Sequence, residues 1–382
     1  MDDYERHKRM WKLFEHFLFI MIRAFRLEYE PISVKGPILL VANHVTACDP
    51  LLVAAALGKN NHVYFVASDH IMRQGLAGRF IQWSCGPIPR RKGAAAMRTV
   101  KECLRHLRAG HSVCLFAEGE QSWDGRNIPV VEGTGSLALA ARVPLVTYRL
   151  EGGYLSMPRW GRGLRRGRVR GRITGVYSPE TLAAMDKSEI NRLLNECIRE
   201  NAWERQKAEN VRFSSRHPAE HLEKCLYLCP QCKRVGTLAS KGDLLSCGCG
   251  FQARYTETGF FESASPFPTL AEWEDWQKGQ LRSRSFQYAS EDGLLFSDGG
   301  VTLTKIDENN RTLWTSEQTE VCQYEDRISC ADRDFPLNEI GDMAMTQASR
   351  LLFSCDGGYY EIRSGGRTNL RKYLEIWMQA HQ

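Results

Sequence analysis

Short apolar runs alternate with helical patterns along the first half of the chain. The runs are rich in β-branched and aromatic side chains, which is typical of buried strands. Strands are predicted at 38–43, 63–68, 87–90, 112–118, 144–150 and 171–176. Helices are predicted at 50–57, 71–83, 94–109 and 134–141, with a charged helical tail at 186–209. This alternation predicts an α/β layered domain with a mostly parallel sheet over residues 31–215.

Residues 1–30 carry a different pattern, an apolar helical face with basic side chains beside it. Their longest uncharged run, Phe17–Ile22, is too short to span a membrane, which needs about 20 apolar residues. The order of charges does not fit a signal peptide either. We expect an amphipathic helix that docks on the protein's own core or lies in a membrane interface, and periodicity does not distinguish the two. Its apolar residues are Trp11, Phe14, Phe17, Leu18, Ile22 and Phe25, and its basic residues are Lys8, Arg9, Lys12 and Arg23.

Two cysteine pairs stand close together in the second half of the chain. Cys229 and Cys232 are separated by fourteen hairpin-like residues from Cys247 and Cys249. Four thiolates at such spacing predict a structural zinc site within a ribbon-like module at 225–256. The second pair has one intervening residue where two are usual, so Cys225 is an alternative ligand, and a redox dithiol or metal-free thiols are alternative interpretations.

Brief alternating runs with Gly and Asp turns follow over residues 257–382, and a helical pattern closes the chain at 369–380. They predict a β-rich accessory domain with a C-terminal helix. The order of these elements is similar to that of a pleckstrin-homology-like barrel, and a lipid-binding or partner-binding role would follow only by analogy.

Charge is unevenly distributed. The net charge is +6, but residues 1–200 hold 30 Lys and Arg against 19 Asp and Glu, whereas the remainder holds 21 against 26. A basic front half suits nucleic acid, an anionic membrane surface or an acidic substrate, and charge alone does not choose among them. Thirteen cysteines, some inside apolar runs, favour a reducing compartment, so we expect a cytoplasmic protein.

A histidine and an aspartate follow the predicted strand 38–43, with His44 in the turn and Asp49 five residues later. A neutral imidazole accepts a hydroxyl proton near pH 7, and a carboxylate on the other ring nitrogen holds its tautomer. Asp49 is placed for that role if the loop folds back. Because Pro50 follows, Asp49 is also an ordinary helix N-cap.

Four blocks in fixed order resemble those of the glycerolipid acyltransferase superfamily typified by 1-acylglycerol-3-phosphate acyltransferase. They are Asn43-His44-(four residues)-Asp49, Gly86-Pro87-Ile88-Pro89-Arg90-Arg91-Lys92, Phe116-Ala117-Glu118-Gly119-Glu120-Gln121-Ser122 and Val143-Pro144-Leu145-Val146. The resemblance covers residues 30 to 210. It implies transfer of a fatty acyl group from acyl-CoA or acyl-carrier protein to a lysolipid hydroxyl, with His44 as general base and Asp49 orienting it.

The resemblance also implies binding residues for the acceptor. Arg90, Arg91 and Lys92 would bind its anionic headgroup, because guanidinium groups bind phosphate oxygens bidentately. We favour Arg91 among them, since alternation places Arg90 and Lys92 on the other side of an extended segment. Glu118 and Gly119 would shape the acceptor pocket.

The third block departs from the common family pattern Glu-Gly-Thr-Arg-Ser. This chain has Glu120 and Gln121 where that pattern has threonine and arginine. An arginine that commonly binds phosphate is therefore missing, and a carboxylate is added. The departure puts a simple phosphomonoester acceptor in doubt and leaves room for a bulkier or less charged headgroup.

An arginine-rich stretch lies between Arg159 and Arg172, with seven arginines, no acid and Trp160. It suits nucleic acid, an anionic membrane or a phosphate-rich acyl donor, or it is a solvated loop. The acyltransferase blocks favour the membrane or the acyl donor as the partner of this stretch. We therefore expect the protein to lie at the cytoplasmic face of a membrane. The rival functions are a catalytically inactive binding protein and a thioesterase with water as acceptor.

Overall fold

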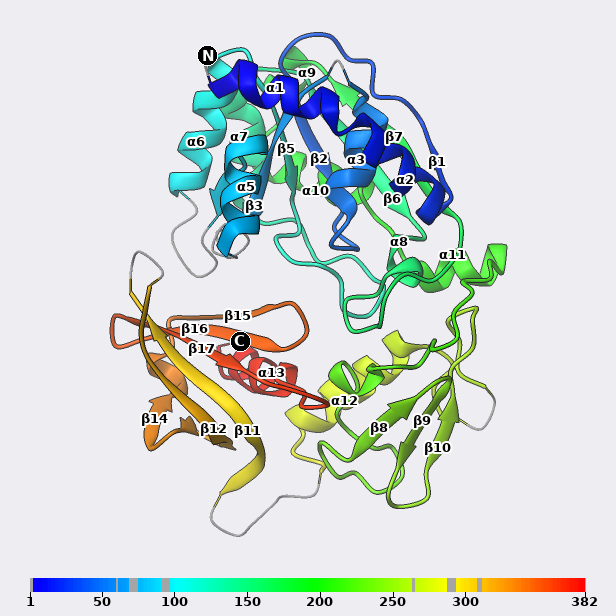
Figure 1. Ribbon diagram of the computed structural model, residues 1–382, viewed down its shortest axis with the longest axis vertical. Coiled ribbons are helices and arrows are strands. Elements are labelled where there is room, and N and C mark those ends of the chain that lie inside the picture. Colours follow the sequence, from blue (N-terminus) through cyan, green and yellow to red (C-terminus); the bar gives the residue numbers. More distant parts are fainter. Residues whose placement is uncertain are drawn as a thin grey trace. The chain divides into compact units, whose positions relative to one another are not determined.

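The computed structural model describes residues 3–59, 61–68, 75–90, 97–262, 265–286, 293–307 and 311–381. The chain divides into two compact units. The first comprises Met1–Arg159 and Gly163–Ser214, and the second comprises Trp160–Arg162 and Ser215–Gln382. Figure 1 shows the helices and strands of each unit.

The first unit is built on a seven-stranded sheet in the order β1-β7-β6-β2-β5-β3-β4. Its neighbouring strands pair in parallel, except that β6 and β7 are antiparallel. The prediction of an α/β domain with a mostly parallel sheet is therefore confirmed. The strands are β1 (Leu27–Tyr29), β2 (Leu39–Ala42), β3 (Val63–Ser68), β4 (Ile88–Arg90), β5 (Ser112–Phe116), β6 (Leu145–Glu151) and β7 (Val169–Tyr177).

The helices of the first unit pack around this sheet (Figure 1). The predicted helices at 71–83 and 94–109 both begin outside the described residues. The predicted tail at 186–209 is two helices, because Asn201 caps the second one through its side chain. The helices are α1 (Asp3–Leu13), α2 (Glu15–Phe25), α3 (Asp49–Leu57), α5 (Gly75–Cys85), α6 (Met97–Arg108), α7 (Gly133–Ala141), α8 (Gly153–Ser156), α9 (Pro179–Ala183), α10 (Lys187–Cys197) and α11 (Ala202–Glu209).

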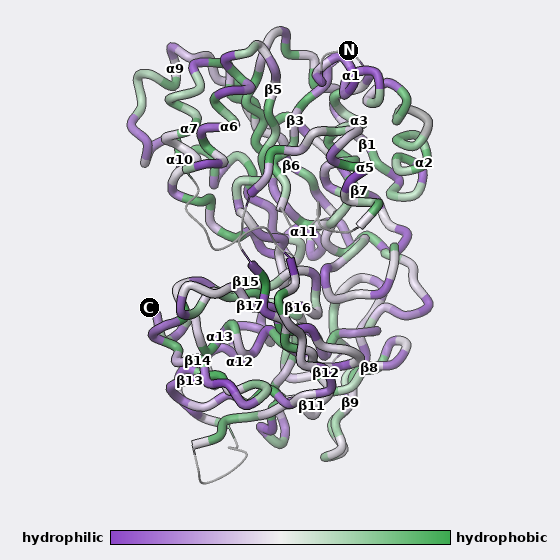
Figure 2. The backbone as a smooth tube through the Cα atoms, turned by 60° about the vertical axis from the view of Figure 1, so that its left-hand side comes forward, coloured by the Kyte–Doolittle hydropathy of each residue, from purple (hydrophilic) through white to green (hydrophobic). Residues whose placement is uncertain are grey.

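The core of the first unit lies on the central strands. All four residues of β2 are fully buried, as expected of a strand covered on both faces. Figure 2 shows apolar segments gathered along this sheet. The short strand β1 was not predicted, because only Leu27 of its three residues is buried and the apolar pattern is correspondingly weak.

The N-terminal segment differs from the single helix predicted for residues 1–30. It forms two helices, and the strand β1 follows them. Trp11, Leu18 and Phe25 are buried on the first unit, and the indole of Trp11 donates to the carbonyl of Gly58 at 2.9 Å. Phe17, by contrast, is 44% exposed. The predicted apolar face is thus divided between the protein core and the surface. No helix in the described part of the chain has both the length and the apolarity of a bilayer span.

The second unit holds two antiparallel sheets (Figure 1). The smaller has the order β10-β9-β8 and carries the cysteine pairs at one end, and the larger has the order β14-β13-β12-β11-β17-β16-β15. The β-rich prediction is confirmed, and the strand order with a closing helix is compatible with the pleckstrin-homology-like arrangement, which stays a prediction. The elements are β8 (Leu238–Lys241), β9 (Leu244–Cys247), β10 (Gln252–Arg254), α12 (Leu270–Arg282), β11 (Leu294–Ile306), β12 (Thr312–Tyr324), β13 (Arg327–Cys330), β14 (Arg333–Pro336), β15 (Asp342–Thr346), β16 (Arg350–Cys355), β17 (Gly358–Arg363) and α13 (Arg371–Ala380).

A buried group of charged side chains joins the parts of the second unit. Arg371 of α13 bonds Glu274 of α12 and lies 3.0 Å from Glu375 and 3.2 Å from the sulfur of Cys225. All four residues are less than 7% exposed. Removing one partner from such a group leaves a buried charge uncompensated, so the contacts hold the segment before the cysteine pairs to the two helices.

Candidate active site

Polar side chains of the sequence blocks gather at the carboxyl edge of the first sheet. His44 follows β2, Glu118 follows β5 and Arg90 ends β4. Parallel strands end at the same edge, so residues separated by up to 74 positions come into contact there.

His44 and Asp49 form a direct pair. His44 Nδ1 lies 2.8 Å from Asp49 Oδ2. The Asp49 side chain is fully buried, whereas the His44 side chain is 20% exposed. Because Nδ1 donates to the carboxylate, the neutral ring carries its lone pair on Nε2. The ring stacks on Phe116 with centroids 4.6 Å apart, which holds the plane of the imidazole.

The Asp49 carboxylate also organises the turn that carries His44. Its Oδ2 accepts the backbone N–H groups of Val45 at 2.6 Å and Thr46 at 2.9 Å, and its Oδ1 accepts the Thr46 hydroxyl. The N-cap of α3 is Cys48, and Asp49 is the first helical residue, so the alternative assignment of Asp49 as N-cap is wrong. Its carboxylate points back to the preceding turn instead.

Glu118 binds the backbone of His44. Its carboxylate accepts the N–H of His44 at 2.8 Å, the N–H of Ile128 at 2.8 Å and the amide of Asn127 at 2.7 Å. Burial raises the pKa of Glu118 to about 7, although these donors favour its charged form. Glu118 therefore joins the turn after β2 to the loop after β5.

Arg90 lies directly on Gly119. A Cβ atom at Gly119 would come within 2.6 Å of Arg90 Nη1, and Gly119 has φ +74°, a conformation that favours glycine. The structure thus places one guanidinium of the second block beside Glu118 and Gly119. Arg91, which we favoured from alternation, and Lys92 lie outside the described residues.

The loop after β5 is anchored at several points. Ser122 N donates to the carbonyl of His44 at 3.1 Å, Tyr154 donates to the carbonyl of Trp123 at 2.9 Å, and Trp203 donates to that of Asp124 at 2.6 Å. Sequence reasoning missed these anchors, and it also missed Phe116 and Asn127 as neighbours of the site. Phe116 and Ser122 belong to the third block and Asn127 lies near it, but the sequence carries no sign of their contacts because the partners lie far along the chain.

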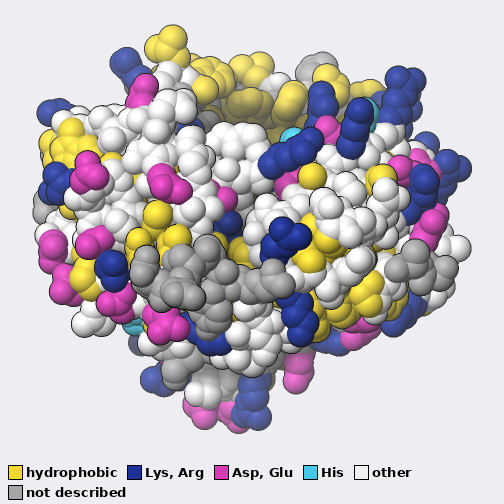
Figure 3. All heavy atoms as spheres, turned by 90° about the horizontal axis from the view of Figure 1, so that it is seen from below, with side chains coloured by type: hydrophobic (Ala, Val, Ile, Leu, Met, Phe, Trp, Pro, Cys, Tyr) yellow, Lys and Arg dark blue, Asp and Glu magenta, His cyan; other side chains and the backbone are white. Residues whose placement is uncertain are grey.

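The arginine-rich stretch is largely paired within the protein. Five of its seven arginines lie within 4.0 Å of a carboxylate, among them Arg159 on Glu120 and Arg172 on Glu151. These contacts make the stretch poorly suited to bind a polyanion. On the face drawn in Figure 3, basic and acidic side chains are interspersed.

A cavity of about 200 Å³ in the first unit lies away from these residues. It is lined by Ile38, Val63 and Ser112, which stand at the amino ends of β2, β3 and β5. Substrate chemistry in such sheets gathers at the carboxyl ends of strands, so we do not assign this cavity to the active site.

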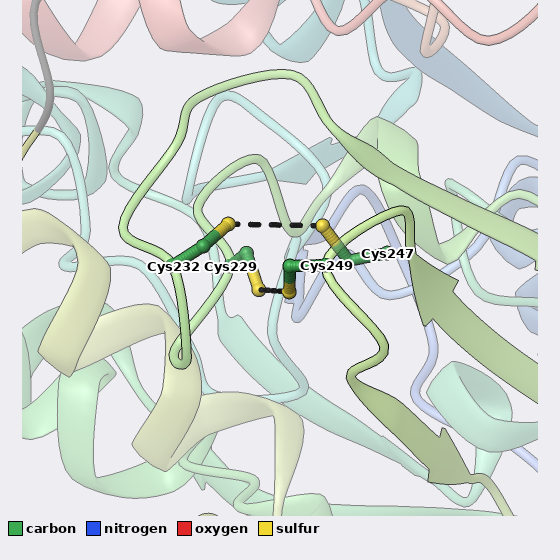
Figure 4. A group of neighbouring side chains, drawn as sticks. All are labelled: Cys229, Cys232, Cys247 and Cys249. Carbon is green, nitrogen blue, oxygen red and sulfur yellow. Dashed lines mark hydrogen bonds between the residues drawn. The ribbon is translucent and has the colours of Figure 1, made fainter.

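The four predicted zinc ligands converge in the second unit (Figure 4). Cys229 Sγ is 3.7 Å from Cys249 Sγ, and Cys232 Sγ is 3.8 Å from Cys247 Sγ. A tetrahedral site with Zn–S bonds of about 2.3 Å has S···S edges of about 3.8 Å, so the thiols fit zinc. Cys225 contacts Arg371 and lies outside this group, so it is not the alternative ligand.

Sequence comparisons relate part of the first unit to known acyltransferases. Residues 25–151 match the family model described as Acyltransferase. The chain is 25% identical over 169 residues to the 1-acyl-sn-glycerol-3-phosphate acyltransferase of Cocos nucifera, covering 42% of this chain and 53% of that protein. It is 26% identical over 151 residues to the probable 1-acyl-sn-glycerol-3-phosphate acyltransferase of Mycoplasma pneumoniae, covering 38% and 56%. The chain thus spans about half the length of these relatives.

Among solved structures, the chain is similar to the 1-acyl-sn-glycerophosphate (LPA) acyltransferase PlsC from Thermotoga maritima. The TM-score is 0.43 at 18% sequence identity, over 52% of this chain and 80% of that one.

The match to the Acyltransferase family model over residues 25–151 lies within the first unit, on its mostly parallel sheet. The relatives matched over this region are 1-acyl-sn-glycerol-3-phosphate acyltransferases, which confirms the resemblance of the four sequence blocks to the glycerolipid acyltransferase superfamily.

Proposed function

We propose that this protein is an O-acyltransferase that moves a fatty acyl group from acyl-CoA or acyl-carrier protein to a hydroxyl of a lysophospholipid or related glycerolipid. The observation that carries the proposal is the His44–Asp49 pair, with a buried carboxylate on Nδ1 and a partly exposed ring. This is the arrangement of a general base that needs no covalent intermediate.

In this mechanism, His44 Nε2 takes the proton of the acceptor hydroxyl as its oxygen attacks the thioester carbonyl. The C–S bond then breaks, and the proton on His44 passes to the leaving thiolate. Asp49 stabilises the imidazolium formed between these steps and holds the ring in position. The products are the ester and the free carrier thiol.

The acceptor headgroup would bind beside the base. Arg90 supports this assignment, because its guanidinium lies against Gly119 and next to the loop that contacts His44. Arg91 and Lys92 are proposed for the same role from the sequence alone. Glu118 and Gly119 would form the pocket wall, with Gly119 allowing the guanidinium to approach the backbone.

A membrane surface is the proposed location, on its cytoplasmic face. Four large apolar side chains of α1 and α2 are 44–69% exposed: Leu13, Phe17, Phe19 and Ile20. Basic residues of the same helices, Arg9, Lys12 and Arg23, are exposed as well. Apolar side chains beside cations suit an interface with anionic lipid headgroups.

Zinc bound by Cys229, Cys232, Cys247 and Cys249 is the proposed cofactor, with a structural role. Four thiolate ligands leave no open position for a substrate, and the sheet β8–β10 has only three short strands. The metal would supply folding free energy to this module.

The test is product formation by the purified full-length chain. Long-chain acyl-CoA and acyl-carrier protein are each offered with a panel of lysolipids in vesicles, and acylated lipid is detected by mass spectrometry. We expect product from the native protein and from His381→Ala, a control at an exposed histidine, and none from His44→Ala. Free fatty acid without lipid product would favour the thioesterase, and no product with either carrier would favour the binding protein.

A further inference from the structure

The two residues that depart from the family pattern lie in a compact contact with the arginine-rich stretch. Arg159 Nη1 is 2.7 Å from Glu120 Oε1 and donates to the backbone carbonyl of Gln121 at 3.3 Å. The guanidinium carbon lies 4.1 Å from the ring centre of Trp123, so its plane is packed on an aromatic face. A cation from 39 positions further along the chain is thus held on the loop after β5.

The two partners differ in exposure. The Arg159 side chain is 4% exposed, whereas the Glu120 side chain is 24% exposed. Glu120 therefore covers the guanidinium and is the member of the pair that solvent reaches. Its carboxylate also neutralises the charge of Arg159 at short range.

The loop that carries Glu120 also contacts the proposed catalytic base. Glu118 accepts the backbone N–H of His44, and the backbone N–H of Ser122 donates to the carbonyl of His44. Glu120 stands midway between these two contacts, next to Gly119, on which Arg90 lies. The segment that binds His44 is therefore the segment that carries Glu120.

We propose that Glu120 is a specificity-determining residue that withholds Arg159 from the acceptor headgroup. The proposal rests on the proposed acyltransferase function and names its acceptor class, a lysolipid with a zwitterionic or neutral headgroup rather than a phosphomonoester. An uncovered arginine would bind phosphate bidentately, whereas a carboxylate in front of it repels a dianion and accepts hydrogen bonds from an ammonium or hydroxyl group.

The test compares acceptors in the full-length protein. We measure kcat/KM for a lysolipid with a phosphomonoester headgroup and for one with a phosphoethanolamine headgroup, with the same acyl chain and donor. The native protein should prefer the second. Glu120→Thr removes the carboxylate from Arg159 and should raise the ratio of the first to the second about ten-fold, the size of one charge-assisted hydrogen bond.

Two further variants separate this effect from a general disturbance. Glu120→Thr combined with Arg159→Met should return the ratio to the native value, because the guanidinium is gone. Glu209→Thr is the matched control, since Glu209 is also 24% exposed and binds Arg168 and Arg170 of the same stretch. It should leave the ratio unchanged. If Glu120→Thr does not fold, Glu120→Gln removes only the charge and should shift the ratio in the same direction.

The outcomes distinguish this inference from the proposed function. A native protein that acylates no lysolipid would overturn the acyltransferase proposal itself. An active native protein that prefers the phosphomonoester, or whose ratio is unchanged by Glu120→Thr and Glu120→Gln, would overturn only the role of Glu120. A ratio that rises in Glu120→Thr and persists without Arg159 would also overturn it.

Discussion

The proposed active site and the cysteine cluster both gather reactive side chains, but they are held in place by different means. His44 and Asp49 stand at the edge of a seven-stranded sheet whose central strand β2 is fully buried. Cys247 ends β9 of a small three-stranded sheet, and Cys229 stands just before a turn outside its strands. Packing can hold the first site without a ligand, whereas the proposed zinc would offset the cost of gathering four thiolates at the second. Substitution of a catalytic residue should therefore leave the first unit folded, whereas substitution of a cysteine of the cluster should destabilise the second unit.

The largest expected effect comes from Asp49→Asn. The amide oxygen can still accept from His44 Nδ1 and from the turn, and the Thr46 hydroxyl can rotate to accept from the amide, so the geometry is retained. The carboxylate charge that stabilises the imidazolium is lost. We expect kcat to fall about 100-fold or more with little change in the melting temperature.

Asp186→Asn is the control for that substitution. Asp186 caps α10, and asparagine is an equally good cap. Steady-state kinetics and thermal unfolding of both variants make the measurement. Unfolding of Asp49→Asn at room temperature would contradict the view that packing alone holds this site.

Loss of a zinc ligand should have the opposite effect. Cys232→Ser should release zinc and destabilise the second unit by several kcal/mol, because one weaker ligand remains where a thiolate stood. Zinc released on denaturation is measured with a colorimetric chelator, and unfolding by circular dichroism. Cys322→Ser, at a cysteine on β12 outside the cluster, is the control and should keep about one zinc per chain. The zinc proposal would be wrong if native protein expressed with ample zinc contained none and were no more stable than Cys232→Ser.

Gly119→Ala should weaken acceptor binding more than catalysis. The methyl group would displace the Arg90 guanidinium, and a positive φ costs a non-glycine residue about 1 kcal/mol. We expect KM for the lysolipid to rise about ten-fold with kcat changed much less. Gly36→Ala, at an equally positive φ with open space around it, separates backbone strain from displacement of Arg90. Equal KM changes in both variants would contradict the role of Arg90.

The smallest effect is the contribution of Glu118 to the pH dependence of stability. Its pKa is about 7 in the folded protein, above the ordinary value of 4.5. The folded state therefore keeps a proton that the unfolded state has lost, so this contribution falls as pH rises from about 4.5 to about 7. In urea unfolding across this range, the native protein should lose more stability than Glu118→Gln. If the free energy of unfolding changed with pH equally in the two proteins, the pKa of Glu118 would not be raised.

Sequence reasoning located most of this architecture. The predicted strand at 63–68 is β3, and the closing helix predicted at 369–380 is α13 at Arg371–Ala380. The first is a continuous apolar run rich in β-branched and aromatic residues, and the second has apolar residues at helical spacing, so both patterns are strong. The three-residue β1 has no such pattern, and the division of residues 1–30 into two helices depends on which apolar side chains meet the core.

The proposed site was predictable where its partners lie close in sequence. Asp49 is five residues from His44, and the four cysteines lie within 21 positions, so spacing alone places both groups. The assignment of Asp49 as an N-cap was wrong because the carboxylate bonds the turn before it, which no propensity predicts. The contact of Cys225 with Arg371 spans 146 positions and equally escaped prediction.

The sequence by itself determined the local chemistry of this protein: the alternation that forms a parallel sheet, the His44–Asp49 pair and the four thiols. Only the tertiary structure decided which side chains hold these residues in position and which charges are paired beside them. It placed Glu118 on the backbone of His44, Arg90 on Gly119 and Arg159 behind Glu120. The physical reason is that strand order and loop packing, rather than spacing along the chain, determine which distant charges meet at the edge of a sheet.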